Sequence, residues 1–218
     1  MVVLPGGRYA GRSADERRHE RRQRLLDAAL SMADEEGFSA LRVRAVCVRA
    51  GLNDRYFYES FSDCDQLLLA IYDQQAALLI EQLSRVIETT ARSELGPRIR
   101  SVIDAGIDFC LDDPRRRRIL EEWQSTAALR DRRDNLVNLL AQMMLDQGRQ
   151  VLGEHITDDP TYQMAGLTVV NGLLELGATW WRGDLDVSRE QLGDFMVAMI
   201  LTSADIGTRV EHELTRQP

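Results

Sequence analysis

Apolar residues recur at the spacing of an α-helix along most of the 218-residue chain, and this pattern limits the fold more than any other feature of the sequence. Leu25, Ala29 and Met32 form one apolar stripe, and Gly37 follows where the C-terminal end of a helix is expected. We find no alternation of apolar and polar residues bounded by hairpin turns, and no internal repeat. The sequence therefore predicts an all-α fold with about nine helices.

Two stretches near the C-terminus, residues 162–181 and 192–206, are apolar on nearly every side. A helix that is apolar all round has to be covered all round. A partner subunit would provide part of that cover, and a fully internal helical hairpin is the alternative. We predict a homodimer, and the expected interface residues are Leu173, Leu176, Phe195 and Met199.

The composition restricts the class of protein. Apolar residues make up 44% of the chain and charged residues 28%, which is typical of a globular protein. No apolar run approaches the roughly 18 residues that a membrane span requires, and the Arg-rich residues 1–24 do not have the apolar centre of a secretory signal. Cys47, Cys64 and Cys110 are odd in number and form no CxxC pair, which is typical of a reducing compartment. We expect a cytoplasmic protein without a membrane partner.

The charges are distributed unevenly along the chain. The formal net charge is -8, and all 27 basic residues are arginine. Residues 1–60 contain 11 arginines and 9 acidic residues, whereas residues 61–218 contain 16 and 26. The acidic body should repel DNA and so confine any contact with it to the basic N-terminal part. There we expect a flexible basic arm over residues 1–20, and the arginines expected to act with this arm on DNA are Arg17, Arg18, Arg21 and Arg22.

Residues 41–60 have the proportions of a helix-turn-helix motif, with two short helices joined by Gly51-Leu52-Asn53. On the second of these helices Phe57 and Phe61 share one side and are expected to pack inward. Arg55 and Glu59 then point outward, where arginine can pair with guanine and glutamate can accept from cytosine in a major groove. An ordinary surface ion pair between Arg55 and Glu59 is the alternative.

The sequence around this motif resembles the TetR family of transcriptional regulators over about 45 residues without a gap. The matching segments are Arg24–Ala29, Gly37-Phe38, Val43-Arg44, Arg49–Leu52, Tyr56–Tyr58, Phe61 and Leu67-Leu68. The resemblance implies a helix-turn-helix DNA-binding domain over residues 21–66 and a ligand-binding and dimerisation domain over residues 67–218. The residues at DNA-contacting positions of the family are Arg42, Arg44, Asn53, Arg55, Tyr56 and Tyr58, and the helical geometry adds Glu59.

The resemblance further implies a repressor that binds a palindromic operator as a homodimer and is released by a small apolar or amphipathic effector. Aromatic and methionine side chains of the larger domain are candidates to line the effector pocket. These candidates are Phe109, Trp123, Met143, Met144, Met164 and Trp180.

The sequence departs from the family at Cys64, where a lysine is common. Cys64 and the acidic residues Asp54, Glu59 and Asp63 favour an alternative, a helical ligand-binding or interaction protein that does not read DNA. No catalytic motif, no cofactor fingerprint and no His or Cys ligand spacing is present, so the sequence predicts no enzyme activity, no cofactor and no metal site.

Overall fold

The computed structural model describes residues 13–122, 126–152, 160–206 and 209–210. Within these ranges the chain forms nine α-helices and one short 3-10 helix, as the all-α prediction requires. The helices are α1 (Ala14–Glu36), α2 (Val43–Ala50), α3 (Asp54–Tyr58), α4 (Cys64–Thr89), α5 (Leu95–Asp112), α6 (Arg115–Glu122), α7 (Ala127–Leu152), α8 (Pro160–Arg182) and α9 (Arg189–Ser203). The chain divides into two compact units, Met1–Ala70 and Ile71–Pro218, and α4 contributes residues to both.

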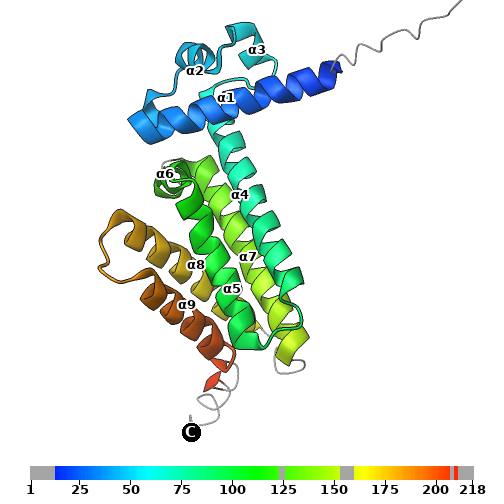
Figure 1. The fold of residues 1–218 in the computed structure, drawn as a ribbon, viewed down its shortest axis with the longest axis vertical. Coiled ribbons are helices and arrows are strands. Elements are labelled where there is room, and N and C mark those ends of the chain that lie inside the picture. The colour runs from blue at the N-terminus through cyan, green and yellow to red at the C-terminus, as the bar shows by residue number, and fades with distance from the viewer. Residues whose placement is uncertain (1–12, 123–125, 153–159, 207–208, 211–218) are drawn as a thin grey trace, which may run out of the picture. The chain divides into compact units, whose positions relative to one another are not determined.

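In the smaller unit, α1 packs against the two short helices α2 and α3 (Figure 1). The core of this unit contains Leu25 and Ala29 from α1, Val46 from α2 and Phe57 from α3, all four of which are fully buried. Helices of five and eight residues are too short to be stable by themselves, so burial against α1 has to stabilise them.

The turn between α2 and α3 depends on Gly51. Its φ of 62° lies in the left-handed region, and this conformation lets the Leu52 amide donate to the Cys47 carbonyl oxygen at 2.9 Å. The Arg24 guanidinium donates to the carbonyl oxygens of Ala50 and Gly51, at 2.5 and 3.2 Å. Helix α1 therefore satisfies the carbonyl groups that α2 leaves open at its C-terminal end.

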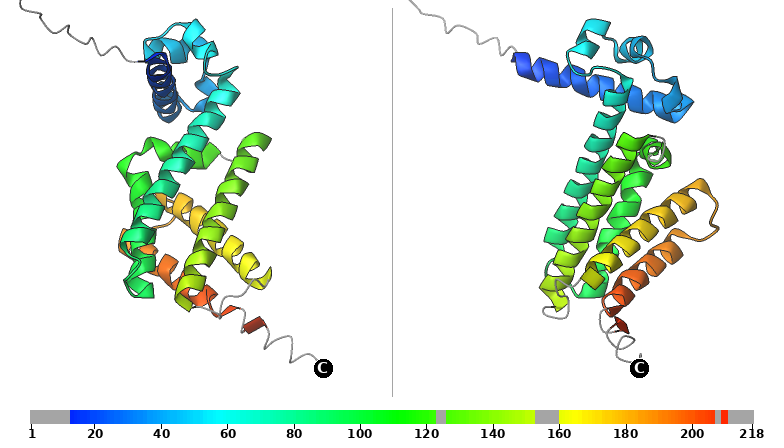
Figure 2. Two further views of the ribbon diagram at one scale, coloured as in Figure 1. Left: turned by 90° about the vertical axis from the view of Figure 1, so that its right-hand side faces the viewer. Right: turned by 180° about the vertical axis from the view of Figure 1, so that it is seen from behind.

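In the larger unit, α7 packs along α8, α5 packs along α9, and α8 and α9 form an antiparallel pair (Figure 2). The buried Ile107, Leu192 and Met196 form one core cluster between α5 and α9. Ion pairs join the same helices, because Arg100 lies 2.7 Å from Asp194, and Arg189 lies 2.7 Å from Asp108 and 3.6 Å from Asp104. A capping box of Ser188 and Gln191 begins α9, at the position that the sequence pattern indicates.

Other helices of this chain cover only one side of α8, although the sequence of α8 is apolar nearly all round. Met164 is 60% exposed, and Thr168, Gly172 and Glu175 are also exposed on this helix. The physical reason is that no helix described in this chain covers the outer side of the α8–α9 pair. On α9 the apolar residues Phe195 and Met199 are also exposed.

Replacing Gly51 with alanine is expected to lower the free energy of unfolding by about 1–2 kcal/mol, because a non-glycine residue is strained in the left-handed region. The new Cβ would also lie 2.9 Å from the Arg24 guanidinium. Gly96→Ala in α5 is the control, since its Cβ meets no atom within 4 Å and alanine favours a helix by up to about 1 kcal/mol. Urea unfolding followed by circular dichroism measures both changes, and equal effects of the two variants would contradict this role of Gly51.

Candidate nucleic-acid interface and apolar cavity

Helix α3 and the turn that follows it are attached to their domain by two aromatic rings, Phe57 in the helix and Phe61 after it. Phe57 and Phe61 are buried, and their ring centroids lie 5.7 Å apart. Asn53 caps the helix, because its side chain accepts a hydrogen bond from the Tyr56 amide at 3.3 Å. The predicted inward side is therefore confirmed, and Asn53 has a structural role in addition to its predicted position at the interface.

The outward side of α3 presents Arg55 and Tyr58, whose exposed fractions are 84% for the Arg55 side chain and 61% for Tyr58. The Nε atom of Arg55 lies 3.3 Å from the Glu59 carboxylate, so the predicted surface pair is present. Because a guanidinium carries five donors, this contact leaves the terminal nitrogens able to pair with an acceptor.

Glu59 does not point freely outward, as the helical geometry alone predicted. Its side chain is 32% exposed, and its carboxylate lies 3.3 Å from Arg21 on α1 as well as 3.3 Å from Arg55. The Arg18 guanidinium donates to the Glu59 carbonyl oxygen at 2.6 Å. The attraction of the α1 arginines explains the difference, and Glu59 connects α3 to α1.

The prediction of a flexible arm over residues 1–20 is wrong for residues 14–20, which belong to α1. Ser13 and Glu16 form a capping box, in which the Ser13 hydroxyl accepts from the Glu16 amide at 3.0 Å and the Glu16 carboxylate accepts from the Ser13 amide at 2.6 Å. This cap starts the helix within the predicted arm. Residues 1–12 lie outside the described residues.

Two of the predicted arm arginines pack on aromatic rings instead of extending toward solvent. The Arg21 guanidinium lies 4.4 Å from the Tyr56 ring centroid, and that of Arg22 lies 4.6 Å from the Phe61 centroid. Arg17 is exposed on the first turn of α1. The arginines of this segment thus contribute to the α1–α3 contact, a role that the sequence analysis did not predict.

Arg42 and Arg44 lie at the start of α2, and both are exposed. Arg42 donates to the carbonyl oxygens of Ser39 and Leu41 at 2.9 and 2.7 Å, so its side chain is folded back onto the preceding turn. Arg44 remains on the surface beside it. The predicted contact residues Arg42, Arg44, Arg55 and Tyr58 are therefore exposed on one small domain.

The three cysteines are poor candidates for redox sensing. Burial raises the pKa of the Cys47 thiol to about 11 and that of Cys110 to about 12. Burial also raises the pKa of Cys64, which is half-buried at the start of α4. All three remain thiols at neutral pH, and the neutral Cys64 offers no charge to a phosphate.

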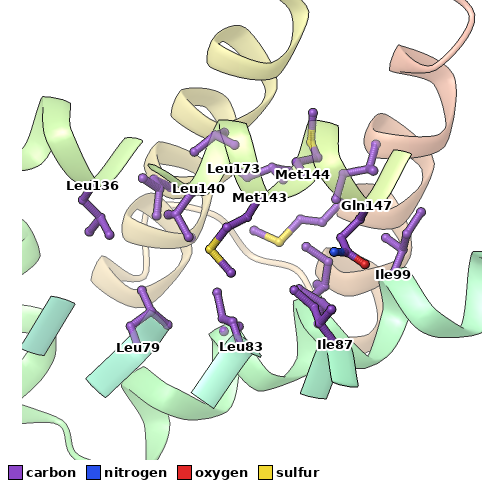
Figure 3. A pocket seen from close by; sticks show the side chains of 18 of the residues that line it. Leu79, Leu83, Ile87, Ile99, Leu136, Leu140, Met143, Met144, Gln147 and Leu173 are labelled. Carbon is purple, nitrogen blue, oxygen red and sulfur yellow. The ribbon is translucent and has the colours of Figure 1, made fainter. Parts of the chain in front are cut away.

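The larger unit contains a cavity of about 280 Å³ lined by residues of α4, α5, α6, α7, α8 and α9. Figure 3 shows the aliphatic side chains of Leu79, Leu83 and Ile87 from α4 facing those of Leu140 and Met143 from α7. The lining is almost entirely apolar. Such a cavity suits an apolar or amphipathic small molecule.

Three of the six predicted pocket residues line this cavity, namely Phe109, Met143 and Met144. Met164 and Trp180 do not, because the rotation of α8 exposes Met164 and turns Trp180 toward the loop before α9, where its Nε1 donates to the Val187 carbonyl oxygen at 2.8 Å. Trp181 lines the cavity instead. Trp123 lies outside the described residues.

The predicted dimer residues separate into two pairs. Leu173 and Leu176 are half-buried and pack against the core cluster of α5 and α9, so they are not part of an open surface. The same rotation of α8 that exposes Met164 turns these two leucines inward. Phe195 is 55% exposed and Met199 is also exposed.

Among the described residues there is no group of three or more His, Cys, Asp or Glu side chains that could hold a metal ion. None of the helices in the described ranges has the length and apolar character that crossing a membrane requires.

Comparison with known protein families identifies the smaller unit. The family model for bacterial regulatory proteins of the tetR family matches residues 25–71, which run from α1 through α3 into α4. The smaller unit belongs to the tetR family of bacterial regulatory proteins. TetR-family members are transcriptional regulators and not enzymes, in agreement with the prediction from the sequence.

Individual relatives agree with this assignment. An uncharacterized HTH-type transcriptional regulator of Haemophilus influenzae is 37% identical over 90 residues, which are 40% of this chain and 42% of that protein. The match thus spans less than half the length of this curated relative.

A proposed transcriptional regulator from Pseudomonas aeruginosa PAO1 has a similar fold, with a TM-score of 0.72 and 18% identity. The similarity covers 93% of this chain and 97% of that one. FadR from Bacillus subtilis, solved in complex with stearoyl-CoA, has a TM-score of 0.64 at 20% identity and covers 83% of this chain and 98% of its own.

Glu59→Gln tests whether this TetR-family domain depends on the contact between α1 and α3. We expect the free energy of unfolding to fall by about 1 kcal/mol at low salt, and by less in 1 M NaCl, where the screening length is about 3 Å. Urea unfolding at both salt concentrations measures the change. Glu81→Gln is the control, because the Glu81–Arg85 pair lies exposed on a single helix and should contribute less than about 0.5 kcal/mol. A loss for Glu59→Gln no larger than the control would rule out this role.

Proposed function

We propose that this protein is a ligand-responsive transcriptional repressor that binds a palindromic operator as a homodimer. The observation that carries the proposal is the side of α3 that presents Arg55 and Tyr58 on a rigidly packed helix-turn-helix domain of the TetR family. Arginine can pair bidentately with guanine, and a tyrosine hydroxyl can donate to a phosphate oxygen. Arg42 and Arg44 add positive charge at the start of α2.

A homodimer is supported by the apolar residues that the outer side of α8 and α9 leaves exposed, Met164, Phe195 and Met199. Three large apolar side chains left exposed on two neighbouring helices are what an interface between subunits would cover. In a homodimer that reads a palindromic operator, the two copies of α3 enter successive major grooves about 34–36 Å apart.

The response to an effector is supported by the apolar cavity of the larger unit. The fold neighbour FadR from Bacillus subtilis was solved in complex with stearoyl-CoA, an amphipathic molecule. An effector that binds one conformation of the dimer better than another shifts the population toward the conformation it prefers, and in a repressor that is the one that releases DNA.

Arg55→Ala and Tyr58→Phe are expected to affect DNA binding differently. Loss of Arg55 removes a base contact, so it should reduce the preference for the operator over a scrambled duplex by about 1–3 kcal/mol. Loss of the Tyr58 hydroxyl removes a phosphate contact and should weaken binding to both duplexes alike. Fluorescence anisotropy with a labelled palindrome from the region upstream of the gene measures both.

Arg92→Gln, which removes an exposed arginine of the larger unit, is the control and should leave DNA binding unchanged. If the unmodified protein shows no salt-sensitive, sequence-dependent binding at low ionic strength, the proposal is overturned. The protein would then be better described as a helical ligand-binding protein that does not read DNA.

Phe195→Asp is expected to shift the protein from dimer to monomer, because it places a charge in a buried apolar interface. Sedimentation velocity at micromolar concentration measures the shift. Glu190→Gln is the control, since Glu190 is an exposed charge in the first turn of the same helix. A Phe195→Asp variant that remains dimeric would place the interface on another surface.

A further inference from the structure

The cavity of the larger unit contains a buried cation that has no anionic partner among the described residues. Arg98, in the first turn of α5, is only 6% exposed and lines the cavity. Its guanidinium donates to the side-chain oxygen of Gln147 on α7, a neutral amide. Its Nε atom is buried without a hydrogen-bond partner, and no carboxylate of the described residues forms an ion pair with it.

Such an arrangement is energetically unfavourable by itself. Arginine is almost never fully buried unless it is paired, because removing a charge from water is costly and a single neutral acceptor offsets little of that cost. A guanidinium carries five donors, so one amide oxygen leaves most of them unused. An anion in the cavity would offset the free-energy cost of burying the Arg98 charge.

The other two arginines that line the cavity already have partners. Arg116 donates to the Gln75 side chain at 3.2 Å and to the Phe109 carbonyl oxygen at 2.6 Å. Arg133 lies 3.7 Å from the Asp134 carboxylate. The lining residues include these three arginines and no acidic residue, so the electrostatic field inside the cavity favours a negative charge.

We propose that the cavity binds an amphipathic monocarboxylate, whose apolar chain lies among the aliphatic residues of α4, α5 and α7 and whose carboxylate pairs with Arg98. The proposal rests on the proposed function in one respect, since it takes the larger unit to be the effector-binding part. Figure 3 shows the Gln147 amide at one end of a row of apolar side chains, Leu83 and Met143 among them. This placement puts the Arg98–Gln147 pair beside a long apolar region of the cavity.

The chemistry of a single guanidinium favours a carboxylate over a phosphate. The planar fork of arginine matches the two oxygens of a carboxylate, and the two charges cancel. A phosphate monoester carries close to two negative charges at neutral pH, so one of them would remain buried without compensation. Gln147 is a positioning residue in this arrangement, because its side-chain oxygen orients the guanidinium toward the cavity.

The test is displacement of the neutral dye 1-N-phenylnaphthylamine from the full-length protein by dodecanoate, dodecanol and dodecyl phosphate, which have the same apolar chain. We expect dodecanoate to bind about ten- to hundredfold more tightly than dodecanol, the factor expected for a hydrogen bond to a charged group. Equal affinity for dodecanoate and dodecanol would overturn the proposal. A preference for dodecyl phosphate over dodecanoate would overturn the assignment of a carboxylate.

Arg98→Met should reduce the preference for dodecanoate to about twofold or less while dodecanol binds as before. Arg92→Gln, which removes an exposed arginine shortly before α5, should keep the full preference. If Arg98→Met does not fold, as judged by circular dichroism, Gln147→Glu replaces it in the test. Its new carboxylate would pair with Arg98 and compete with the ligand, so the preference for dodecanoate should again be lost. Retention of the preference in a folded Arg98→Met or Gln147→Glu protein would overturn the role of Arg98.

The dye assay contains no DNA, so the two proposals can fail separately. If the protein does not bind its palindrome but prefers dodecanoate, the carboxylate site is supported and the repressor function is overturned. If it binds its palindrome but binds dodecanoate and dodecanol with equal affinity, the repressor function is supported and the carboxylate site is overturned.

Discussion

The packing of α3 against α1 is the interaction on which the smaller unit depends. A helix of five residues gains too few internal hydrogen bonds to be stable alone, so its position comes from contacts with the rest of the domain. Phe57 and Phe61 bury the inner side of α3, while Arg18 and Arg21 of α1 contact Glu59 at its end. The exposed Arg55 and Tyr58 are thereby presented on a fixed surface, which lowers the entropy that binding a partner would cost.

Much of the fold could be predicted from the sequence, because helical periodicity and caps are local signals. The capping box of Ser188 and Gln191 marks the start of α9 in both sequence and structure. The start of α1 could have been found in the same way from Ser13 and Glu16, which have the same spacing. The clustered arginines that follow predict a flexible arm, but the capping box begins a helix there, so the local cap is the better indicator.

The site residues were harder to predict, because they depend on contacts between distant parts of the chain. The spacing of Arg55 and Glu59 predicts that both point outward, but it carries no information about Arg21, which lies far away in sequence and turns Glu59 toward α1. In the same way, the sequence of a helix that is apolar all round does not determine which of its sides faces the cavity. Trp180 and Trp181 are chemically identical neighbours, and only the packing of α8 determines that Trp181 lines the cavity.

The exclusive use of arginine has a consequence for how the smaller unit can be controlled. Lysine charges can be removed by acetylation, but this chain has no lysine to modify. A guanidinium also stays protonated at every pH at which a protein remains folded. The positive charges of Arg18, Arg21, Arg42 and Arg55 are therefore permanent, so neither lysine acetylation nor a change in pH can neutralise them. Contact with a polyanion has to be weakened while these charges stay in place, by ionic strength, by a change in shape or by negative charge added nearby.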